Sequence, residues 1–148
     1  MRLKNQKFFI EKERKMQKTY IMLKPDAVKR GLMGKIISRI EEKGFQIVDA
    51  KMFTLTQAQL EEHYAHLKEK PFFKDIVSYM TSGPVLGMVV QGDEVIAGMR
   101  KIMGATKWLE AEPGTIRGDF AFSTTENLIH GSDAEETAQA EIKRFFGY

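Results

Sequence analysis

Residues 85–90 read VLGMVV, an apolar run with no charged side chain. A strand with one face in water would alternate polar and apolar side chains, so a run that is apolar on both faces is typical of a strand buried on both sides of a sheet. The turn-forming triplets SGP at 82–84 and QGD at 91–93 limit the run to strand length. We therefore predict a central strand here.

The segments on either side predict alternating strands and helices. Residues 18–23 (KTYIML) are mainly β-branched, aromatic or apolar and are stopped by Pro25, as expected of a second buried strand. Residues 45–55 predict a third strand with an irregularity near Ala50, and LIH at 128–130 predicts a short fourth one. Helical spacing, capping residues or turn residues predict helices at 32–43, 57–66, 71–80, 94–103 and 133–146.

This order predicts an α+β fold. If the helical pair between residues 57 and 80 is treated as an insertion, the remaining elements read βαββαβ. That order implies an antiparallel, ferredoxin-like sheet with helices on one face. Residues 104–118 show no periodicity and predict a long loop, and DFAF at 119–122 predicts a further extended piece.

Size and composition indicate one domain with a basic extension. The chain has 148 residues, 43% of them hydrophobic and none of them cysteine, and no apolar stretch long enough for a membrane span. We expect a soluble, cytoplasmic protein without disulfides. Residues 1–15 carry six Lys or Arg and two Glu, so the remaining 133 residues are close to neutral. We therefore predict a disordered or weakly ordered extension at 1–15 and a domain at 16–148, and we keep a functional basic arm as the alternative.

Histidines are the first candidates for chemistry. His130 ends the apolar step of NLIHGSD (127–133) and is followed by a glycine, where a ligand could approach closely. His63 and His66 stand three residues apart on a predicted helix, but no third ligand is evident, so we expect both at the surface.

A set of polar and cationic side chains in turns and loops strengthens the case for His130. It comprises Lys24, Arg100, Thr106 and Arg117. Guanidinium groups and a lysine placed in this way suit a polyanion such as a triphosphate. Unrelated surface charges are the alternative.

Six ordered motifs resemble one known family. They are YIMLKPDAVKRGL, HYAHLKEKPFF, TSGPV, RKIMGAT, PGTIRGDF and NLIHGSD, and the resemblance that they carry extends over about residues 18–146. The sequence resembles nucleoside diphosphate kinases, which transfer a γ-phosphoryl group between nucleotides by a ping-pong route through a phosphohistidine. The resemblance implies Mg²⁺ held mainly by the nucleotide phosphates, with no direct protein ligand. It also implies nucleoside di- and triphosphates as partners and a homo-oligomer, either a tetramer or a hexamer.

The resemblance also implies roles for individual residues. His130 matches the nucleophile and Glu141 the carboxylate that orients its ring. The matches to other functional positions are Tyr64 near the transferred group, Lys24, Arg100, Thr106 and Arg117 at the phosphates, Phe72 at the base, and Asn127 with Lys24 at the sugar. Ser132 would lie near the histidine, Gly131 would leave room for a phosphate, and Asp133 would begin the helix that carries Glu141.

Two departures from the family pattern affect the expected site. Lys107 and Trp108 follow the GAT triplet where relatives often have a proline, and residues 124–126 (TTE) replace an apolar-Gly-Arg pattern. The first change alters a loop used in subunit contacts, and the second removes an apolar contact with the base. Two other classes stay open: a ferredoxin-like module that binds nucleotides or nucleic acid without turnover, and an adapter that binds an anionic surface through residues 1–15. We expect neither a nucleic-acid nor a membrane partner for the enzyme itself.

Overall fold

The computed structural model describes residues 15–148, so the predicted extension lies outside the described residues except for Lys15. Its four strands are β1 (Met16–Leu23), β2 (Gln46–Phe53), β3 (Val85–Asp93) and β4 (Ile129–Gly131). The helices are α2 (Pro25–Lys29), α3 (Met33–Glu42), α4 (Gln57–His63), η1 (Ala65–Leu67), α5 (Phe73–Met80), α6 (Val95–Met103), α7 (Ile116–Phe120) and α8 (Glu135–Phe146). Within this part of the chain, no helix is both long enough and apolar enough to cross a bilayer.

The strands form one antiparallel sheet in the order β2-β3-β1-β4. The run at 85–90 is buried throughout in β3, next to β1, as predicted for a central strand. In β2 the register shifts between Ile47 and Asp49, close to the irregularity predicted at Ala50. Strand β4 pairs with the end of β1 and places His130 opposite Met22.

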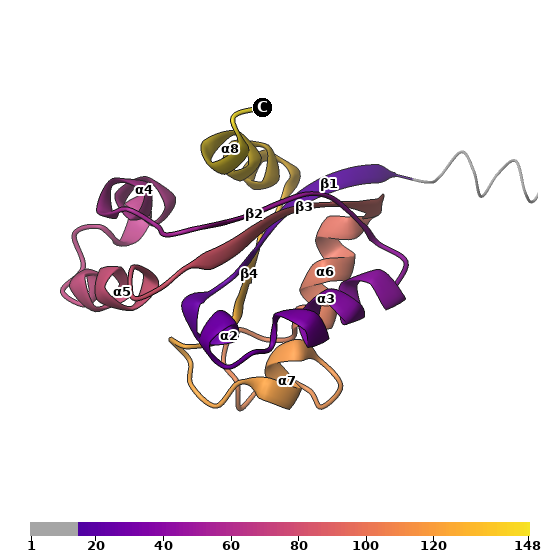
Figure 1. The fold of residues 1–148 in the computed structure, drawn as a ribbon, viewed down its shortest axis with the longest axis horizontal. Coiled ribbons are helices and arrows are strands. Elements are labelled where there is room, and N and C mark those ends of the chain that lie inside the picture. Colours follow the sequence, from indigo (N-terminus) through magenta and orange to yellow (C-terminus); the bar gives the residue numbers. More distant parts are fainter. Residues whose placement is uncertain (1–14) are drawn as a thin grey trace, which may run out of the picture.

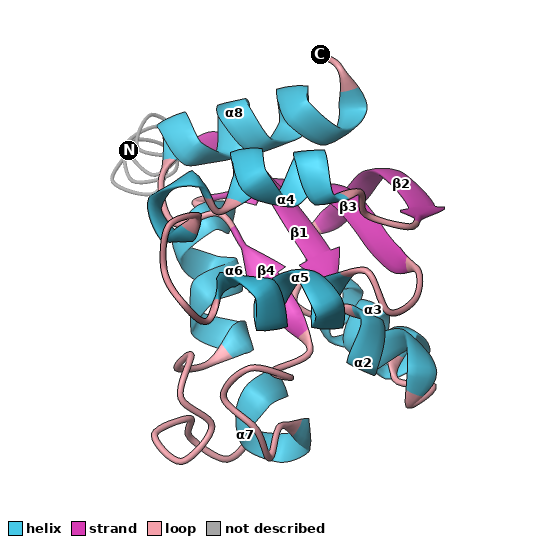
Figure 2. Cartoon of the chain, turned by 90° about the vertical axis from the view of Figure 1, so that its left-hand side faces the viewer, coloured by secondary structure: helices cyan, strands magenta, loops and turns pink. Residues whose placement is uncertain are grey.

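Helices cover both faces of this sheet (Figures 1 and 2). The connecting helices α3 and α6 pack with α7 on one face, over Ile21, Met88 and Val90. The ferredoxin-like α+β prediction is confirmed. The inserted pair α4–α5 and the last helix, α8, cover the other face over Tyr20, Met22 and Val89, a second layer that the prediction did not place.

The helix boundaries follow local sequence signals. Thr56 forms the predicted capping box, because its side chain accepts from the backbone N–H of Gln59 and the Gln59 side chain accepts from the backbone N–H of Thr56. In α6 the predicted inward residues Val95, Ile96 and Met99 are buried. The extended piece predicted at 119–122 is wrong in its first half, since Asp119 and Phe120 close the short helix α7. Thr115 caps that helix through a hydrogen bond from the N–H of Gly118, a signal hidden inside an aperiodic segment.

Candidate active site

Strand β4 presents His130 at the edge of the sheet through a constrained turn. Leu128 has a φ of +76°, and the N–H of Ile129 donates to the carbonyl of Asn127, so the chain makes a γ-turn just before the histidine. The Leu128 carbonyl accepts from the N–H of Lys24, and the Leu128 side chain is fully buried. These contacts hold a backbone shape that a non-glycine residue adopts only at a cost. They fix the position from which the His130 side chain leaves the backbone.

Glu141 holds one nitrogen of the His130 ring. Nε2 lies 2.8 Å from Glu141 Oε1 and 3.0 Å from Oε2. Burial raises the pKa of the Glu141 carboxyl, but hydrogen bonds and charge from His130, together with a hydrogen bond from Ser132, outweigh it and hold that pKa below its usual range. The carboxylate therefore stays charged and accepts the Nε2–H, which leaves Nδ1 as the ring nitrogen with a free lone pair.

A further hydrogen bond to the Glu141 carboxylate comes from Ser132. Ser132 donates its hydroxyl to Oε1 at 2.6 Å and is only 1% exposed. The hydroxyl therefore reaches the same carboxylate oxygen that contacts His130 Nε2, so Ser132 lies near the histidine and is linked to it through Glu141. The helix that carries Glu141 begins at Glu135, two residues after Asp133.

His63 lies beside the same carboxylate, so its predicted surface position is wrong. It is buried, its Nδ1 lies 3.4 Å from Glu141 Oε2, and its ring centroid lies 4.7 Å from that of His130. Burial, together with the neighbouring His130, lowers the pKa of His63 to about 3. Nδ1 accepts a hydrogen bond from Arg144 at 3.0 Å. His66, in contrast, is exposed on η1, as predicted.

Tyr64 follows His63 at the end of α4, and its ring meets the His63 ring edge-on at 4.7 Å. Burial, with the charge of Glu141, raises the pKa of the Tyr64 hydroxyl to about 12. Tyr64, Arg100 and His130 line one cavity of about 550 Å³ together with His63 and Glu141. The hydroxyl is therefore a neutral donor beside the histidine near neutral pH.

Lys24 and Arg117 are brought together by Asn127. Lys24 Nζ donates to Asn127 Oδ1 at 2.7 Å, and burial, with repulsion from Arg117, lowers the pKa of Lys24 to about 8. Arg117 is buried and donates to the carbonyls of Asn127, Gly104 and Ile129. Its pKa is lowered to about 10 by burial and by Arg100. Arg117 therefore fixes the loop after α6 against β4 and also adds positive charge to the site.

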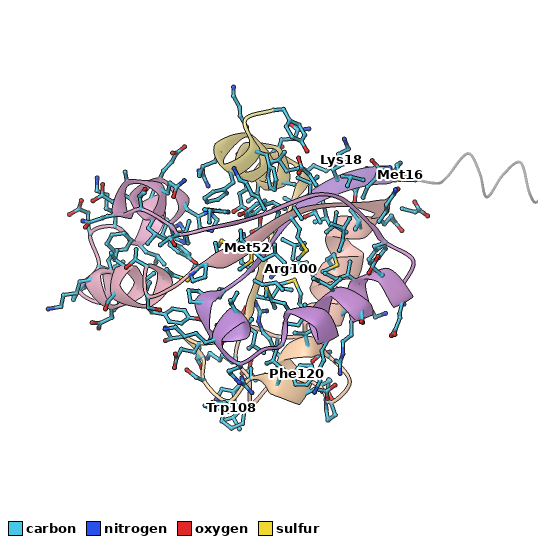
Figure 3. All side chains as sticks on the ribbon, in the orientation of Figure 1. Met16, Lys18, Met52, Arg100, Trp108 and Phe120 are labelled. Carbon is cyan, nitrogen blue, oxygen red and sulfur yellow. The ribbon has the colours of Figure 1, made fainter. Side chains whose placement is uncertain are left out.

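The other predicted residues lie around these groups. Arg100 is exposed and donates to the carbonyl of Gly131, and the Thr106 carbonyl accepts from the Asn127 amide. Phe72 is 48% exposed and lines a second cavity of about 410 Å³ together with Lys24 and Thr106. In the view of Figure 3, Trp108 and Phe120 lie at the end that carries α7, and Arg100 lies away from that end.

The residues that depart from the family pattern lie in different surroundings. Thr125 lines the second cavity with Phe72, Glu126 is exposed, and Trp108 packs against the core beneath α7. Gly131 lines the cavity of about 550 Å³ together with His130, and the room expected there for a phosphate stays a prediction. A Cβ there would lie 2.7 Å from Met103 Sδ in the core, so this glycine is required for packing of β4 against α6.

His63 and Arg144 were not predicted as neighbours of the site, although the sequence holds a local signal for each. Leu60 is buried and His63 is three residues further along α4, so both face the same side of the helix. Arg144 is likewise three residues after Glu141 on α8. That these two helix faces meet is a tertiary fact that spacing alone does not reveal.

An imidazole held by a carboxylate on one nitrogen, with cations and a neutral hydroxyl around it, is suited to phosphoryl transfer. A sequence profile described as nucleoside diphosphate kinase matches residues 17–148. The nucleoside diphosphate kinase of Halalkalibacterium halodurans is 55% identical over 131 residues, 88% of this chain and 89% of that protein. The one from a Synechococcus species is 56% identical over 130 residues, 88% of this chain and 86% of that protein.

Solved structures agree with the sequence comparisons. The apo nucleoside diphosphate kinase of Encephalitozoon cuniculi has a TM-score of 0.87 at 46% identity, covering 89% of this chain and 90% of its own. The Halobacterium salinarum enzyme in complex with CDP has a TM-score of 0.87 at 44% identity, covering 90% of both chains. The chain belongs to the nucleoside diphosphate kinase family. It is a nucleotide-binding phosphotransferase with nucleoside diphosphate kinase activity, which confirms the class expected from its motifs.

Proposed function

We propose that His130 Nδ1 is the nucleophile of a two-step exchange. In the first half-reaction its lone pair attacks the γ-phosphorus of a nucleoside triphosphate, usually ATP. A P–N bond forms, the bond from phosphorus to the β–γ bridging oxygen breaks, and the nucleoside diphosphate leaves. In the second half-reaction a terminal oxygen of another nucleoside diphosphate takes the group and restores the ring. The contact of 2.8 Å between Nε2 and Glu141 carries this proposal, because it leaves Nδ1 free to react.

Glu141 is proposed to stabilise the charge that forms on the ring. Phosphorylation at Nδ1 while Nε2 keeps its proton makes the imidazole cationic, and the ionised carboxylate lies against that proton. Tyr64 has the properties of a donor to the transferred group, since its hydroxyl stays neutral in the cavity that His130 lines.

The cations are proposed to hold the phosphates and Asn127 the sugar. Lys24, Arg100 and Arg117 supply positive charge, Thr106 supplies a hydroxyl, and Asn127 joins Lys24 at the ribose hydroxyls. Phe72 is an exposed aromatic ring in the cavity that also contains Lys24, which suits stacking on a base. Stacking accepts every base, so we expect broad nucleotide use.

Mg²⁺ is proposed to be bound mainly by the nucleotide. Among residues 15–148, the group of metal-ligating side chains that comes together is His63, His130 and Glu141, and it offers a single carboxylate. Mg²⁺ prefers oxygen ligands and commonly bridges substrate phosphates, so these residues fit a site where the phosphates supply the ligands. Bound there, the ion would neutralise charge on the β- and γ-phosphates.

The remaining expectations concern the organisation of the chain. We propose a cytoplasmic homo-oligomer, tetramer or hexamer, in which residues 16–148 form the catalytic domain. Lys15, at the end of the predicted extension, already contacts this domain through Asp93, Glu94 and Glu135. Deletion of residues 1–14 should therefore leave kinase activity unchanged, and salt-dependent retention on nucleic acid or lipid would reveal a separate role for them.

A labelling experiment tests the proposed nucleophile. Protein incubated with γ-labelled ATP and Mg²⁺ and then quenched in alkali should carry a label that is stable in alkali and lost in acid. His130→Ala should carry none, whereas His66→Ala should be labelled like the wild type, because His66 is exposed and lies outside the trio of His63, His130 and Glu141. A folded, active wild type without label, or a labelled His130→Ala, would contradict the proposal. A folded protein that binds nucleotide but neither carries label nor turns over would instead support a binding module.

A further inference from the structure

Three metal-ligating side chains converge in the cavity that Arg100 also lines. The ligand atoms of His63, His130 and Glu141 all lie within 4.8 Å of one another. Glu141 is the centre of the group, since its carboxylate is 2.8 Å from His130 Nε2 and 3.4 Å from His63 Nδ1. The sequence alone pairs His63 with His66, but the fold pairs it with a histidine 67 positions away.

Two of the three separations are close to those of a tetrahedral metal site. The ligand nitrogens of His63 and His130 lie within 4.8 Å of each other, so the two rings would move closer on binding a metal. Bonds from zinc to imidazole nitrogen and carboxylate oxygen are about 2.0–2.2 Å, so neighbouring ligand atoms in a tetrahedron lie about 3.3 Å apart. The His63–Glu141 separation of 3.4 Å already fits this value, and the His130–Glu141 separations of 2.8 and 3.0 Å need only a small increase. Two imidazoles and a carboxylate are also a ligand set that zinc enzymes use with a fourth position left open.

We propose that His63, His130 and Glu141 form a binding site for a transition-metal dication, with Zn²⁺ as the best-fitting ion, and that its occupancy switches off the histidine nucleophile. Mg²⁺ is a poor candidate because it demands oxygen ligands, whereas imidazole nitrogen suits zinc and its neighbours. The cavity of about 550 Å³ is lined by all three residues and gives the ion a route in.

Arg144 competes with the cation for the site. Its guanidinium donates to His63 Nδ1 at 3.0 Å, which occupies the lone pair that a metal would need. Arg144 also lies 3.2 Å from Glu62, whose side chain is 66% exposed, so the guanidinium has a partner toward solvent when it leaves His63. The site therefore opens only when the cation is abundant enough to displace Arg144.

The loss of the nucleophile follows from proton placement on one ring. In the free enzyme the proton on Nε2 faces Glu141 and Nδ1 has a lone pair. A cation bound at Nε2 takes that lone pair, so a neutral ring must carry its proton on Nδ1. The proton moves from one nitrogen to the other through solvent and none is gained or lost by the ring. This consequence depends on the proposed role of His130, whereas binding of the cation does not.

Titration with Zn²⁺ in the absence of nucleotide tests the site. The chain has no cysteine and three histidines, so a tag-free protein offers few competing ligands. Competition with a fluorescent zinc chelator should reveal one equivalent bound by wild type and by His66→Ala, and binding at least about tenfold weaker in His63→Asn. Arg144→Gln should bind several-fold more tightly, because it removes a positive charge and a competing donor. Since Arg144 is partly exposed, this variant keeps the test valid if His63→Asn does not fold.

Three results would overturn the site itself. The first is an absence of stoichiometric binding by the wild type, and the second is an equal affinity of wild type, His63→Asn and Arg144→Gln. Loss of binding in His66→Ala would overturn it as well, because that histidine lies outside the trio.

The switching effect needs a second measurement. With Mg²⁺–ATP in excess, added Zn²⁺ should lower the alkali-stable phosphoenzyme in wild type and His66→Ala, EDTA should restore it, and His63→Asn should resist. If Zn²⁺ binds at the trio while phosphoenzyme forms in full, the proposed inhibition of the histidine nucleophile by Zn²⁺ is wrong. If no phosphoenzyme forms without Zn²⁺, the proposed function fails instead, and the two failures are thereby distinguished.

Discussion

Glu141 receives hydrogen bonds from two groups. Substitutions can separate the effect of its charge on catalysis from the effect of holding its carboxylate in place. Both its contacts, to His130 Nε2 and to the Ser132 hydroxyl, are shorter than 3.1 Å and shielded from water. The charge matters for the cationic ring, whereas the Ser132 bond matters for keeping the carboxylate in place.

Glu141→Gln should lower kcat by about 10- to 100-fold, because the amide oxygen can still accept the Nε2–H but no longer carries charge. Ser132→Ala should have a smaller effect, since the carboxylate keeps His130. The rate of phosphoenzyme formation in a rapid-quench experiment measures both. A Ser132→Ala enzyme slower than Glu141→Gln would contradict the charge argument.

Lys24 gives the free enzyme a pH dependence. Burial and the nearby Arg117 lower its pKa to about 8, so the amine loses its charge as the pH rises through that value. Because only the charged amine attracts phosphate, kcat/KM for the nucleotide should fall above pH 8 and stay high below it. In Lys24→Met the value should be lower at every pH and this decline should be missing. A wild-type profile that is flat up to pH 10 would contradict the role of Lys24.

At the scale of elements, local signals predicted most helices and strands. The capping box at Thr56 and the apolar run in β3 are local, and both were correct. Helix α7 could not be predicted because it is one short turn within an aperiodic segment. Arg117 secures it through a hydrogen bond to the carbonyl of Gly104, whereas the Thr115 hydroxyl donates to the nearby carbonyl of Glu112. The same applies to the site. The motifs and the family resemblance predicted His130, Glu141 and Lys24 as site residues. The contact of His63 with Glu141 could not be predicted, because it depends on how α4 packs against α8.

Gly118 shows how closely the loop before α7 approaches that helix. A Cβ on Gly118 would lie 1.9 Å from the carbonyl oxygen of Glu112, so any side chain forces the backbone apart. Gly118→Ala should therefore displace the neighbouring Arg117 and reduce kcat/KM by more than about tenfold, with a lowered melting temperature.

The matched control for Gly118 is Gly34→Ala in α3, where a Cβ meets nothing within 4 Å. It should be neutral or stabilising by up to about 1 kcal/mol. Steady-state kinetics and thermal unfolding measure kcat/KM and the melting temperature of the two variants. Equal values for Gly118→Ala and Gly34→Ala would contradict the steric explanation.

At the scale of the whole molecule, the sheet has one edge that suits self-association. Strand β2 lies at the edge and carries the exposed apolar side chains Val48 (40%) and Met52 (50%) (Figure 3). An exposed apolar edge strand is a template for pairing with another chain, and the proposed homo-oligomer provides such a partner.

Met52→Glu should shift the protein to a smaller assembly in light scattering at micromolar concentration, because it places charge in that contact. Met16→Glu is the control, since Met16 is 63% exposed at the start of β1 and away from the edge. An unchanged mass for Met52→Glu, or an equal shift for both variants, would exclude this edge as the interface.

The site itself is assembled at this largest scale. Strand β4 supplies His130, α8 supplies Glu141, α4 supplies His63 and Tyr64, and the turn after β1 supplies Lys24. These elements meet where the second helical layer covers the end of β4 (Figure 2). This arrangement leaves Nδ1 of His130 as the reactive ring nitrogen, and the proposed mechanism depends on the identity of that nitrogen.

Nuclear magnetic resonance of the phosphoenzyme, prepared with ¹⁵N-labelled histidine, shows directly which ring nitrogen carries the phosphate. Phosphorus coupling should appear at Nδ1 of His130, with Nε2 still protonated against Glu141. Coupling at Nε2, or phosphate on another residue of a fully active enzyme, would contradict the account.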